Sequence, residues 1–133
     1  MIIFVIPYDK QTERWSAAGP QIDDTTLSSA LDAIVQSGAD ISVFDGASRF
    51  DYTTKLWFRG QRGQATIATF DDDHERTGYF FDESRVDEPD IDLAGDNWPA
   101  SIVANDTETM LQILTDFVEG RDLTRHPYWD PED

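Results

Sequence analysis

Short apolar stretches alternate with polar ones along this chain, and each stretch has the length of one strand or one helix. Residues 2–6 form a continuous apolar run rich in β-branched side chains, which is typical of a buried strand, and Pro7 is expected to end it. Residues 26–37 place apolar side chains at helical spacing, with Gly38 where a left-handed cap belongs. The N-terminal third therefore predicts a strand followed by a helix.

The middle of the chain shows the period-two alternation of strands. We expect Leu56 and Phe58 to face one side of a strand and Trp57 to face the other. Neighbouring strands with short links favour an antiparallel sheet. The predicted strands are residues 41–44, 52–59, 64–70 and 79–81, with a hairpin turn over residues 60–63.

The C-terminal part predicts a loop, a short strand and a helix. Residues 82–99 hold two prolines and a glycine and predict a long loop, and residues 101–104 predict a short strand. Residues 106–119 carry an apolar stripe at helical spacing, and Asn105 with Glu108 forms a pattern like a capping box at its start. These residues therefore predict a second helix that packs on the sheet.

Length and composition fit one domain over residues 1–133. The chain is 39 % hydrophobic, which is enough for a core, and it has no cysteine, which excludes a disulfide framework. The N-terminal apolar run is too short for a membrane span and lacks the basic region of a signal peptide, so a cytoplasmic location is expected. We expect an α+β fold: an antiparallel sheet of about five or six strands with two helices packed on it.

The charge of the chain narrows the range of partners. Lysine and arginine number 10, against 27 aspartates and glutamates, which gives a net charge of −17. Such a field repels nucleic acid and anionic membranes, and it attracts basic proteins. We therefore expect no direct nucleic-acid binding and no membrane binding. Solubility or salt adaptation accounts for the composition as well as a basic partner does.

About half of this net charge lies in residues 71–96, which hold 11 acidic side chains and two arginines. Aromatic side chains lie among the carboxylates, and rings beside carboxylates suit a protein interface. A solvated surface loop would have the same charge run. The partner-binding residues expected in this acidic, loop-rich segment, about residues 71–99, are Asp71, Asp72, Asp73, Glu75, Tyr79, Phe81, Asp82, Glu83, Asp87, Glu88, Asp90, Asp92, Asp96 and Trp98.

The sequence contains no recognisable catalytic or metal-binding motif. His74 and His126 lack metal-ligand spacing, and there is no phosphate loop or nucleophile elbow. Residues 71–82 fail as a calcium loop because Arg76 stands at the position of the required glycine and Asp82 at that of the glutamate. We expect no catalytic residue, metal or cofactor, and a protein that is not an enzyme; an acid–base site made of carboxylates stays open.

The C-terminal half resembles a known protein family. Gly78-Tyr-Phe-Phe81, Ile102-Val103 and Phe117-Val-Glu-Gly-Arg121, followed by Trp129, give an aromatic strand, an acidic loop, a short strand and a capped helix in that order. In this order and in the placement of its aromatics, the segment resembles the first-numbered immunity protein family of bacterial polymorphic toxin systems. The resemblance implies a protein that binds and inhibits a cognate toxin, often a nucleic-acid deaminase or nuclease, and it transfers no catalytic residue.

The resemblance and the charge agree with each other. An enzyme that grips nucleic acid needs a basic groove, and an inhibitor that offers carboxylates and rings to this groove would occlude it. Two alternatives stay open. A nucleic-acid mimic or anti-restriction protein would space its carboxylates like phosphates over much of its surface, and a salt-adapted acidic interaction domain would owe its acidity to its environment.

Overall fold

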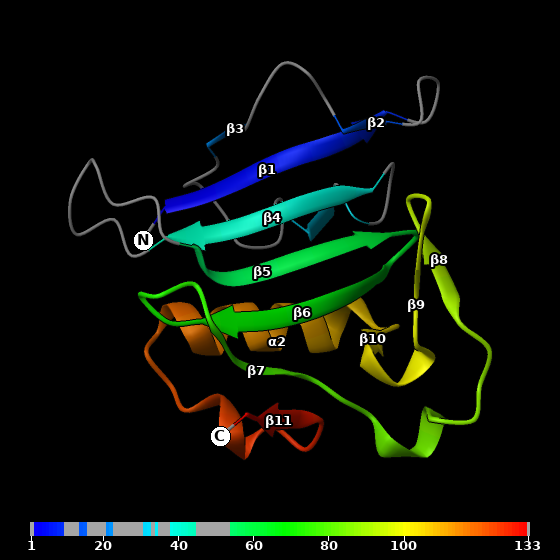
Figure 1. The fold of residues 1–133 in the computed structure, drawn as a ribbon. Helices are drawn as coiled ribbons and strands as arrows, with labels where there is room; N and C mark the ends of the chain where they lie inside the picture. The colour runs from blue at the N-terminus through cyan, green and yellow to red at the C-terminus, as the bar shows by residue number, and fades with distance from the viewer. Residues whose placement is uncertain are drawn as a thin grey trace.

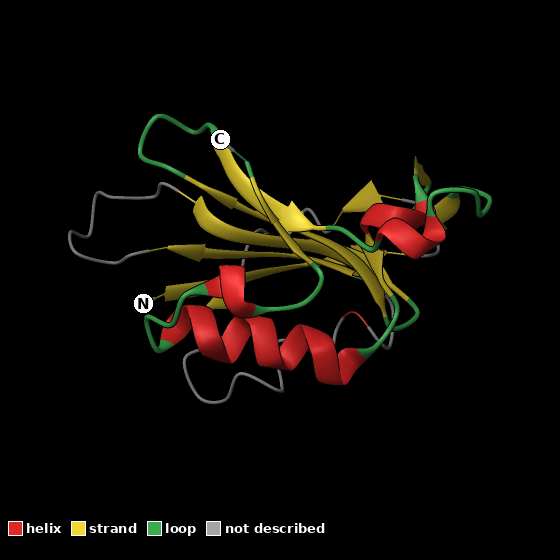
Figure 2. Cartoon of the chain, turned by 90° about the horizontal axis from the view of Figure 1, so that it is seen from below, coloured by secondary structure: helices red, strands yellow, loops and turns green. Residues whose placement is uncertain are grey.

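The structure, a computed structural model, describes residues 2–9, 14–15, 21–22, 31–32, 34, 38–44 and 54–132. Its centre is a twisted antiparallel sheet (Figure 1). An α-helix, α2, packs along one face of the sheet (Figure 2). The elements are β1 (Ile2–Asp9), β2 (Arg14–Trp15), β3 (Gln21–Ile22), β4 (Ala39–Phe44), β5 (Thr54–Gln61), β6 (Gln64–Phe70), β7 (Arg76–Phe80), η1 (Glu83–Arg85), β8 (Ile91–Leu93), β9 (Asp96–Trp98), η2 (Ala100–Ile102), β10 (Val103–Ala104), α2 (Thr107–Val118), η3 (Leu123–Arg125) and β11 (Trp129–Pro131).

The strand order confirms the predicted antiparallel sheet. The long strands lie in the order β7-β6-β5-β4-β1, and the short strands pair with them: β11 with β7, β10 with β6, and β2 and β3 with β1. Each of these pairings is antiparallel. Strands β8 and β9 form a separate hairpin.

The core lies between the sheet and α2. Leu56 and Phe58 of β5 are fully buried on the helix side, whereas Trp57 is partly exposed on the other side, as the alternation predicts. Met110 and Leu114 of α2 are also fully buried. The buried cluster consists of Leu31, Ile34, Ala39, Ile41, Val43, Leu56, Phe58, Ala65, Ile67, Phe80, Ala104, Met110, Ile113, Leu114, Leu123 and Trp129.

The predicted capping residue of α2 is wrong by one position. Asp106, not Asn105, has the extended backbone of an N-cap, and its carboxylate accepts a hydrogen bond from the amide of Glu108 at 2.9 Å. The helix begins at Thr107, so Asn105 lies one residue before the N-cap. Gly120 follows the helix with a φ of +75°, the left-handed conformation that favours glycine.

Pro7 does not end β1, which continues to Asp9. The amide of Tyr8 donates to the carbonyl of Gly38, and because successive amides of a strand alternate in direction, the nitrogen of Pro7 faces away from β4. On that side Pro7 lies between the residues paired with β3 and those paired with β2. The missing N–H therefore removes no ladder hydrogen bond.

The predicted loop over residues 82–99 and the strand over 101–104 need correction. The loop contains η1 and the β8–β9 hairpin, and residues 100–102 form the 3-10 turn η2, so only Val103 and Ala104 pair with β6. The hairpin forms because Leu93 is fully buried and because two residues with positive φ make a tight turn after it.

The predicted helix over residues 26–37 falls mostly outside the described residues. Leu31, Asp32 and Ile34 are helical there, and Leu31 and Ile34 belong to the core. Gly38 has a φ of +102°, as a left-handed cap requires. Within the described ranges, no helix has the length and apolar character to cross a membrane.

Candidate functional site

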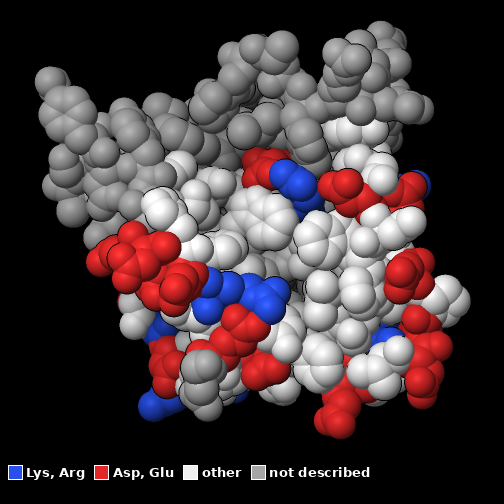
Figure 3. All heavy atoms as spheres, viewed as in Figure 1, with Lys and Arg blue, Asp and Glu red and all other residues white. Residues whose placement is uncertain are grey.

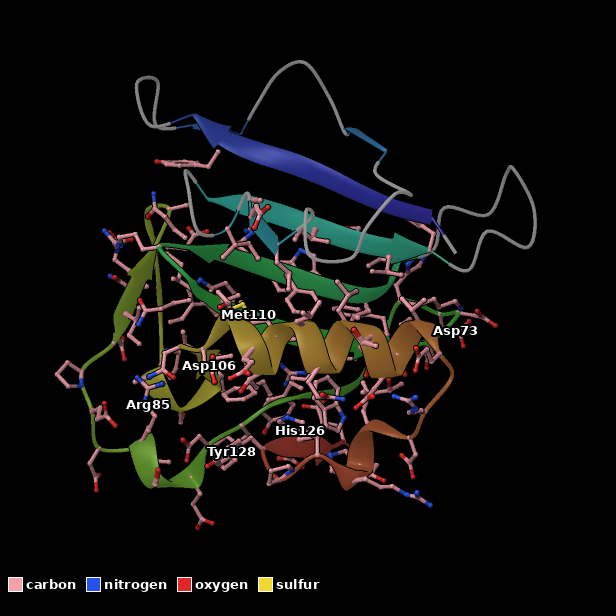
Figure 4. All side chains as sticks on the ribbon, turned by 180° about the vertical axis from the view of Figure 1, so that it is seen from behind. Asp73, Arg85, Asp106, Met110, His126 and Tyr128 are labelled. Atoms are coloured by element: carbon pink, nitrogen blue, oxygen red, sulfur yellow. The ribbon has the colours of Figure 1, made fainter. Side chains whose placement is uncertain are left out.

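The structure divides the predicted partner-binding residues between two ends of the molecule. Residues 71–75, named here the acidic turn, connect β6 to β7. Residues 82–98, named here the acidic shoulder, contain η1 and the β8–β9 hairpin. Asp73 in the turn and Arg85 in the shoulder lie at opposite ends (Figure 4). On the sheet face opposite α2, carboxylates gather along two sides of the molecule (Figure 3).

The acidic turn uses part of its charge to hold its own shape. One carboxylate oxygen of Asp71 accepts hydrogen bonds from the amides of Asp73 at 2.9 Å and Glu75 at 3.0 Å. Asp72 forms an ion pair with Lys55. Two of the four predicted carboxylates in this turn therefore have partners within the chain.

The acidic shoulder begins with a capped 3-10 turn. The Oδ1 atom of Asp82 accepts hydrogen bonds from the amide and the hydroxyl of Ser84, at 3.1 and 2.6 Å. Arg85 donates from Nη1 to the carbonyl of Val103 at 2.9 Å and from Nε to Glu88 at 3.2 Å. Arg85, the arginine of the shoulder, is thus held by a backbone carbonyl and by one carboxylate.

The remaining shoulder carboxylates are left without cations. Glu83, Asp87 and Asp90 are exposed, and the described part of the chain offers their side chains no ion pair or hydrogen bond. Val86, next to Arg85, is 55 % exposed, which is unusual for a large apolar side chain in this structure. The shoulder therefore combines uncompensated negative charge with exposed apolar surface.

The β5–β6 turn braces the β8–β9 hairpin. The side chain of Gln61 accepts a hydrogen bond from the amide of Ala94 at 3.1 Å, and Arg62 donates to the carbonyl of Asp92 at 2.8 Å. The carboxylate of Asp92 accepts from the amide of Gly95 at 2.9 Å. The hairpin therefore has a fixed position on the sheet, although its strands have three residues each.

Asp96 and Trp98 of β9 belong to a network on the sheet face opposite α2. Asp40 accepts hydrogen bonds from the indole of Trp57 at 2.6 Å and from Arg59 at 2.6 and 3.1 Å. Arg59 also lies 3.4 Å from Asp96 and over the Trp57 ring. The Trp98 ring lies 6.2 Å from the Trp57 ring, and its buried indole N–H has no hydrogen-bond partner within the described residues. These contacts attach the hairpin to β5.

A groove lies between η1 and β11. It has a volume of about 330 Å³. The amide of Phe81 donates to the carbonyl of Tyr128 at 2.7 Å, which fastens the two walls together. Tyr128 is 44 % exposed. The groove is lined by Phe81, Asp82, Glu83, Ser84, Pro127, Tyr128, Trp129 and Asp130.

Tyr79 lies beside this groove on β7. Its ring meets the ring of Phe81 edge-on at 6.0 Å, and the guanidinium of Arg76 lies over it at 4.6 Å. A hydrogen bond to the carboxylate of Asp130 raises the pKa of Tyr79, and burial acts in the same direction. Arg76 is held by Glu132, whose hydrogen bond raises the pKa of Arg76. Tyr79 thus positions groove residues rather than lining the groove.

A second cavity, of about 500 Å³, lies between the end of α2, η3 and the strands β5, β6, β7 and β11. Its lining is mostly apolar. Its two cations already bind carboxylates, Lys55 that of Asp72 and Arg121 those of Asp116 and Glu119. The smaller groove therefore carries more uncompensated charge and is the stronger candidate for a binding site.

The groove brings together residues that the sequence predicts to bind a partner and residues that it does not. Phe81, Asp82 and Glu83 were expected in the site, whereas Tyr128 and Asp130 were not. The signal available was the mixture of rings and aspartate in residues 127–130. In the described ranges, no group of three or more histidine, aspartate or glutamate side chains is arranged to hold a metal ion.

Comparison with known proteins adds information about the fold. No protein-family model matches the chain, and no curated protein matches it. A solved structure, described as a hypothetical protein from Neisseria gonorrhoeae, is similar with a TM-score of 0.63 and 10 % sequence identity. The match covers 91 % of this chain and 88 % of the other. At this identity, the similarity shows a shared fold and nothing of function.

Proposed function

We propose that this chain is an immunity protein that binds a cognate bacterial toxin and occludes its basic active site. The observation that carries the proposal is the acidic shoulder, where Glu83, Asp87 and Asp90 are exposed, no cation among the described residues pairs with them, and Val86 is exposed next to Asp87. Uncompensated charge costs stability through self-repulsion. A basic partner would remove this cost on binding.

The shoulder has the composition of a protein interface. Carboxylates accelerate encounter with a basic surface, and apolar and aromatic side chains supply contact energy once the surfaces meet. A toxin that acts on nucleic acid, such as a deaminase or a nuclease, needs a cationic groove for its substrate. A carboxylate-rich shoulder can take the place of that substrate.

The proposal places the contact at the shoulder rather than over the whole acidic segment. The acidic turn lies at the other end of the molecule (Figure 4), and two of its carboxylates already have partners within the chain. A nucleic-acid mimic would instead use carboxylates distributed over both ends.

Co-expression tests the function directly. The toxin encoded by the neighbouring gene should stop growth when it is expressed alone, and this chain should restore growth and co-purify with the toxin. A toxin that stays fully active in the presence of excess chain would contradict the proposal. Unfolding of the isolated chain at low salt, with recovery in molar salt and no toxin binding, would favour salt adaptation instead.

A further inference from the structure

The groove between η1 and β11 is lined by aromatic rings and by carboxylates. Asp82, Glu83 and Asp130 contribute the carboxylates, and the lining residues within the described ranges include no lysine or arginine. Ser84 donates two hydrogen bonds to Asp82, and both end on the Oδ1 atom of that carboxylate. Glu83 is exposed, so its carboxylate is available to a ligand. The groove therefore attracts a positive charge.

The aromatic wall of the groove is held in place before any ligand arrives. The Tyr128 ring lies 5.8 Å from the Phe80 ring and 6.1 Å from the His126 ring. Its main chain is fixed on both sides, because its carbonyl accepts from the Phe81 amide and its amide donates to Nδ1 of His126. An exposed ring that is held this firmly can bind a ligand at little cost in entropy.

In two other places among the described residues, a ring and a carboxylate together bind an arginine side chain. Arg76 lies over the ring of Tyr79 and pairs with the carboxylate of Glu132. Arg59 lies over the ring of Trp57 and pairs with Asp40. In both places a guanidinium stacks on a ring while a carboxylate accepts its N–H groups. The groove offers a ring and carboxylates, and no guanidinium of the described residues lines it.

We propose that this groove binds one arginine side chain of a basic partner protein. Arginine fits better than lysine because its planar guanidinium stacks on an aromatic face and donates in a fork to a carboxylate. A volume of about 330 Å³ is at the small end of ligand pockets, which suits one side chain rather than a nucleotide or a peptide. This inference rests on the proposed function for the identity of the partner, but not for the chemistry of the groove.

The groove can be tested without any toxin. The probe is N-acetyl-arginine amide, titrated into the labelled chain at low ionic strength with amide NMR signals as the readout. We expect saturable shifts at Phe81, Ser84 and Tyr128. The citrulline analogue has the same shape without the charge and should bind at least tenfold more weakly, and the lysine analogue at least threefold more weakly.

Variants locate the site. Tyr128→Ala and Glu83→Gln should each weaken arginine binding about fivefold or more, while Glu108→Gln, the same chemical change on an exposed residue of α2, should leave it within twofold. Tyr128→Phe keeps the ring and should retain most of the binding. Shifts that do not saturate, equal binding of citrulline, or an unchanged affinity in Tyr128→Ala would overturn the proposal.

The two proposals fail in different ways. Saturable arginine binding by a chain that does not inhibit the toxin would support the groove and contradict the immunity function. Toxin inhibition that is unchanged in Tyr128→Ala, in a chain that does not bind the arginine probe, would support the immunity function and contradict the groove.

Discussion

Among the described residues, three other than glycine hold a left-handed backbone, and each lies in a hairpin turn. Arg62 has a φ of +57°, His74 of +63° and Ala94 of +53°. This region is sparsely populated by side chains that carry a Cβ, and asparagine tolerates it better than alanine does. The turn at Ala94 is held by the hydrogen bond that its own amide donates to the side chain of Gln61 and by the one that Arg62 donates to the carbonyl of Asp92.

Relief of this strain should stabilise the hairpin of the acidic shoulder. Ala94→Asn creates the Asn-Gly pair favoured in two-residue hairpin turns and should raise the free energy of unfolding by about 0.5–1 kcal/mol. Gly95→Ala is the matched control. It meets no atom within 4 Å but has a φ of +93°, so it should cost about 1 kcal/mol through backbone strain alone. Urea unfolding measures both, and a loss of stability in Ala94→Asn would contradict the account of the turn.

His126 gives one wall of the groove a dependence on pH. Burial lowers the pKa of His126, and Asp116 acts in the opposite direction. The pKa of His126 is therefore higher in the unfolded chain, at about 6.5, than in the folded chain. As the pH falls below this value, the unfolded chain binds more protons at His126 than the folded chain does. The stability that the neutral ring contributes is present above this pH and is lost as the pH falls toward the folded-state pKa. Protonation would also remove the hydrogen bond from the amide of Tyr128 to Nδ1.

The corresponding prediction compares the two histidines. The free energy of unfolding of the natural chain should fall between pH 7.5 and pH 5.5, and His126→Gln should fall less over the same range. His74→Gln, at an exposed position, should follow the natural chain. Chemical unfolding at each pH gives the answer, and equal slopes for the natural chain and His126→Gln would exclude the role assigned to His126.

At the scale of elements, the start of α2 depends on one carboxylate. Asp106→Ala removes the acceptor for the amide of Glu108 and should cost about 1 kcal/mol. Asn105→Ala, one residue earlier and exposed, should change stability by less than about 0.5 kcal/mol. Thermal and urea unfolding of the two variants distinguish the two caps. A larger loss of stability in Asn105→Ala than in Asp106→Ala would show that Asn105 caps the helix, as the sequence predicts.

The attachment of β11 depends on a glycine in β7. A Cβ on Gly78 would lie 2.6 Å from Nε1 of Trp129, so Gly78→Ala must displace the indole and should cost about 1–3 kcal/mol. The smaller ring in Trp129→Phe should reduce this cost. Hydrogen exchange should show faster opening of residues 126–132 in Gly78→Ala. If Gly78→Ala lowers the free energy of unfolding equally in the natural chain and in Trp129→Phe, this double-mutant cycle would show that the indole is not the obstacle.

The elements that can be predicted from the sequence are those long enough for their apolar and polar residues to show a periodic pattern. Strands β5 and β6 and helix α2 carry their pattern over seven or more residues. Strand β8 has three residues, so no period is visible, and its hairpin depends on burial of Leu93 and on contacts from Gln61. Strand β11 pairs with residues about fifty positions earlier, and no local pattern encodes that register.

At the scale of the molecule, the sequence located the charge but not its arrangement. The acidic turn and the acidic shoulder are neighbours along the chain, but β7 separates them. A strand rises about 3.3 Å per residue, so the residues from Glu75 to Asp82 carry the chain roughly 20 Å. The groove, in turn, requires a C-terminal segment whose place beside η1 is set by long-range pairing.

The separation of turn and shoulder allows a matched test. The shoulder variant combines Glu83→Gln, Asp87→Asn and Asp90→Asn, and the turn variant combines Asp72→Asn, Asp73→Asn and Glu75→Gln. Each variant removes three exposed negative charges from a chain of net charge −17. Any effect of total charge is therefore the same in both, while the turn variant also removes the ion pair of Asp72 with Lys55.

The most direct measurement of the central claim is the association rate of these chains with the purified toxin domain encoded by the neighbouring gene, at low and at high salt. The shoulder variant should associate about tenfold more slowly than the natural chain at low salt and should lose most of its salt dependence, because electrostatic attraction sets the encounter rate. The turn variant should stay within about twofold of the natural chain. An unchanged rate in the shoulder variant, or a larger loss in the turn variant, would contradict the account.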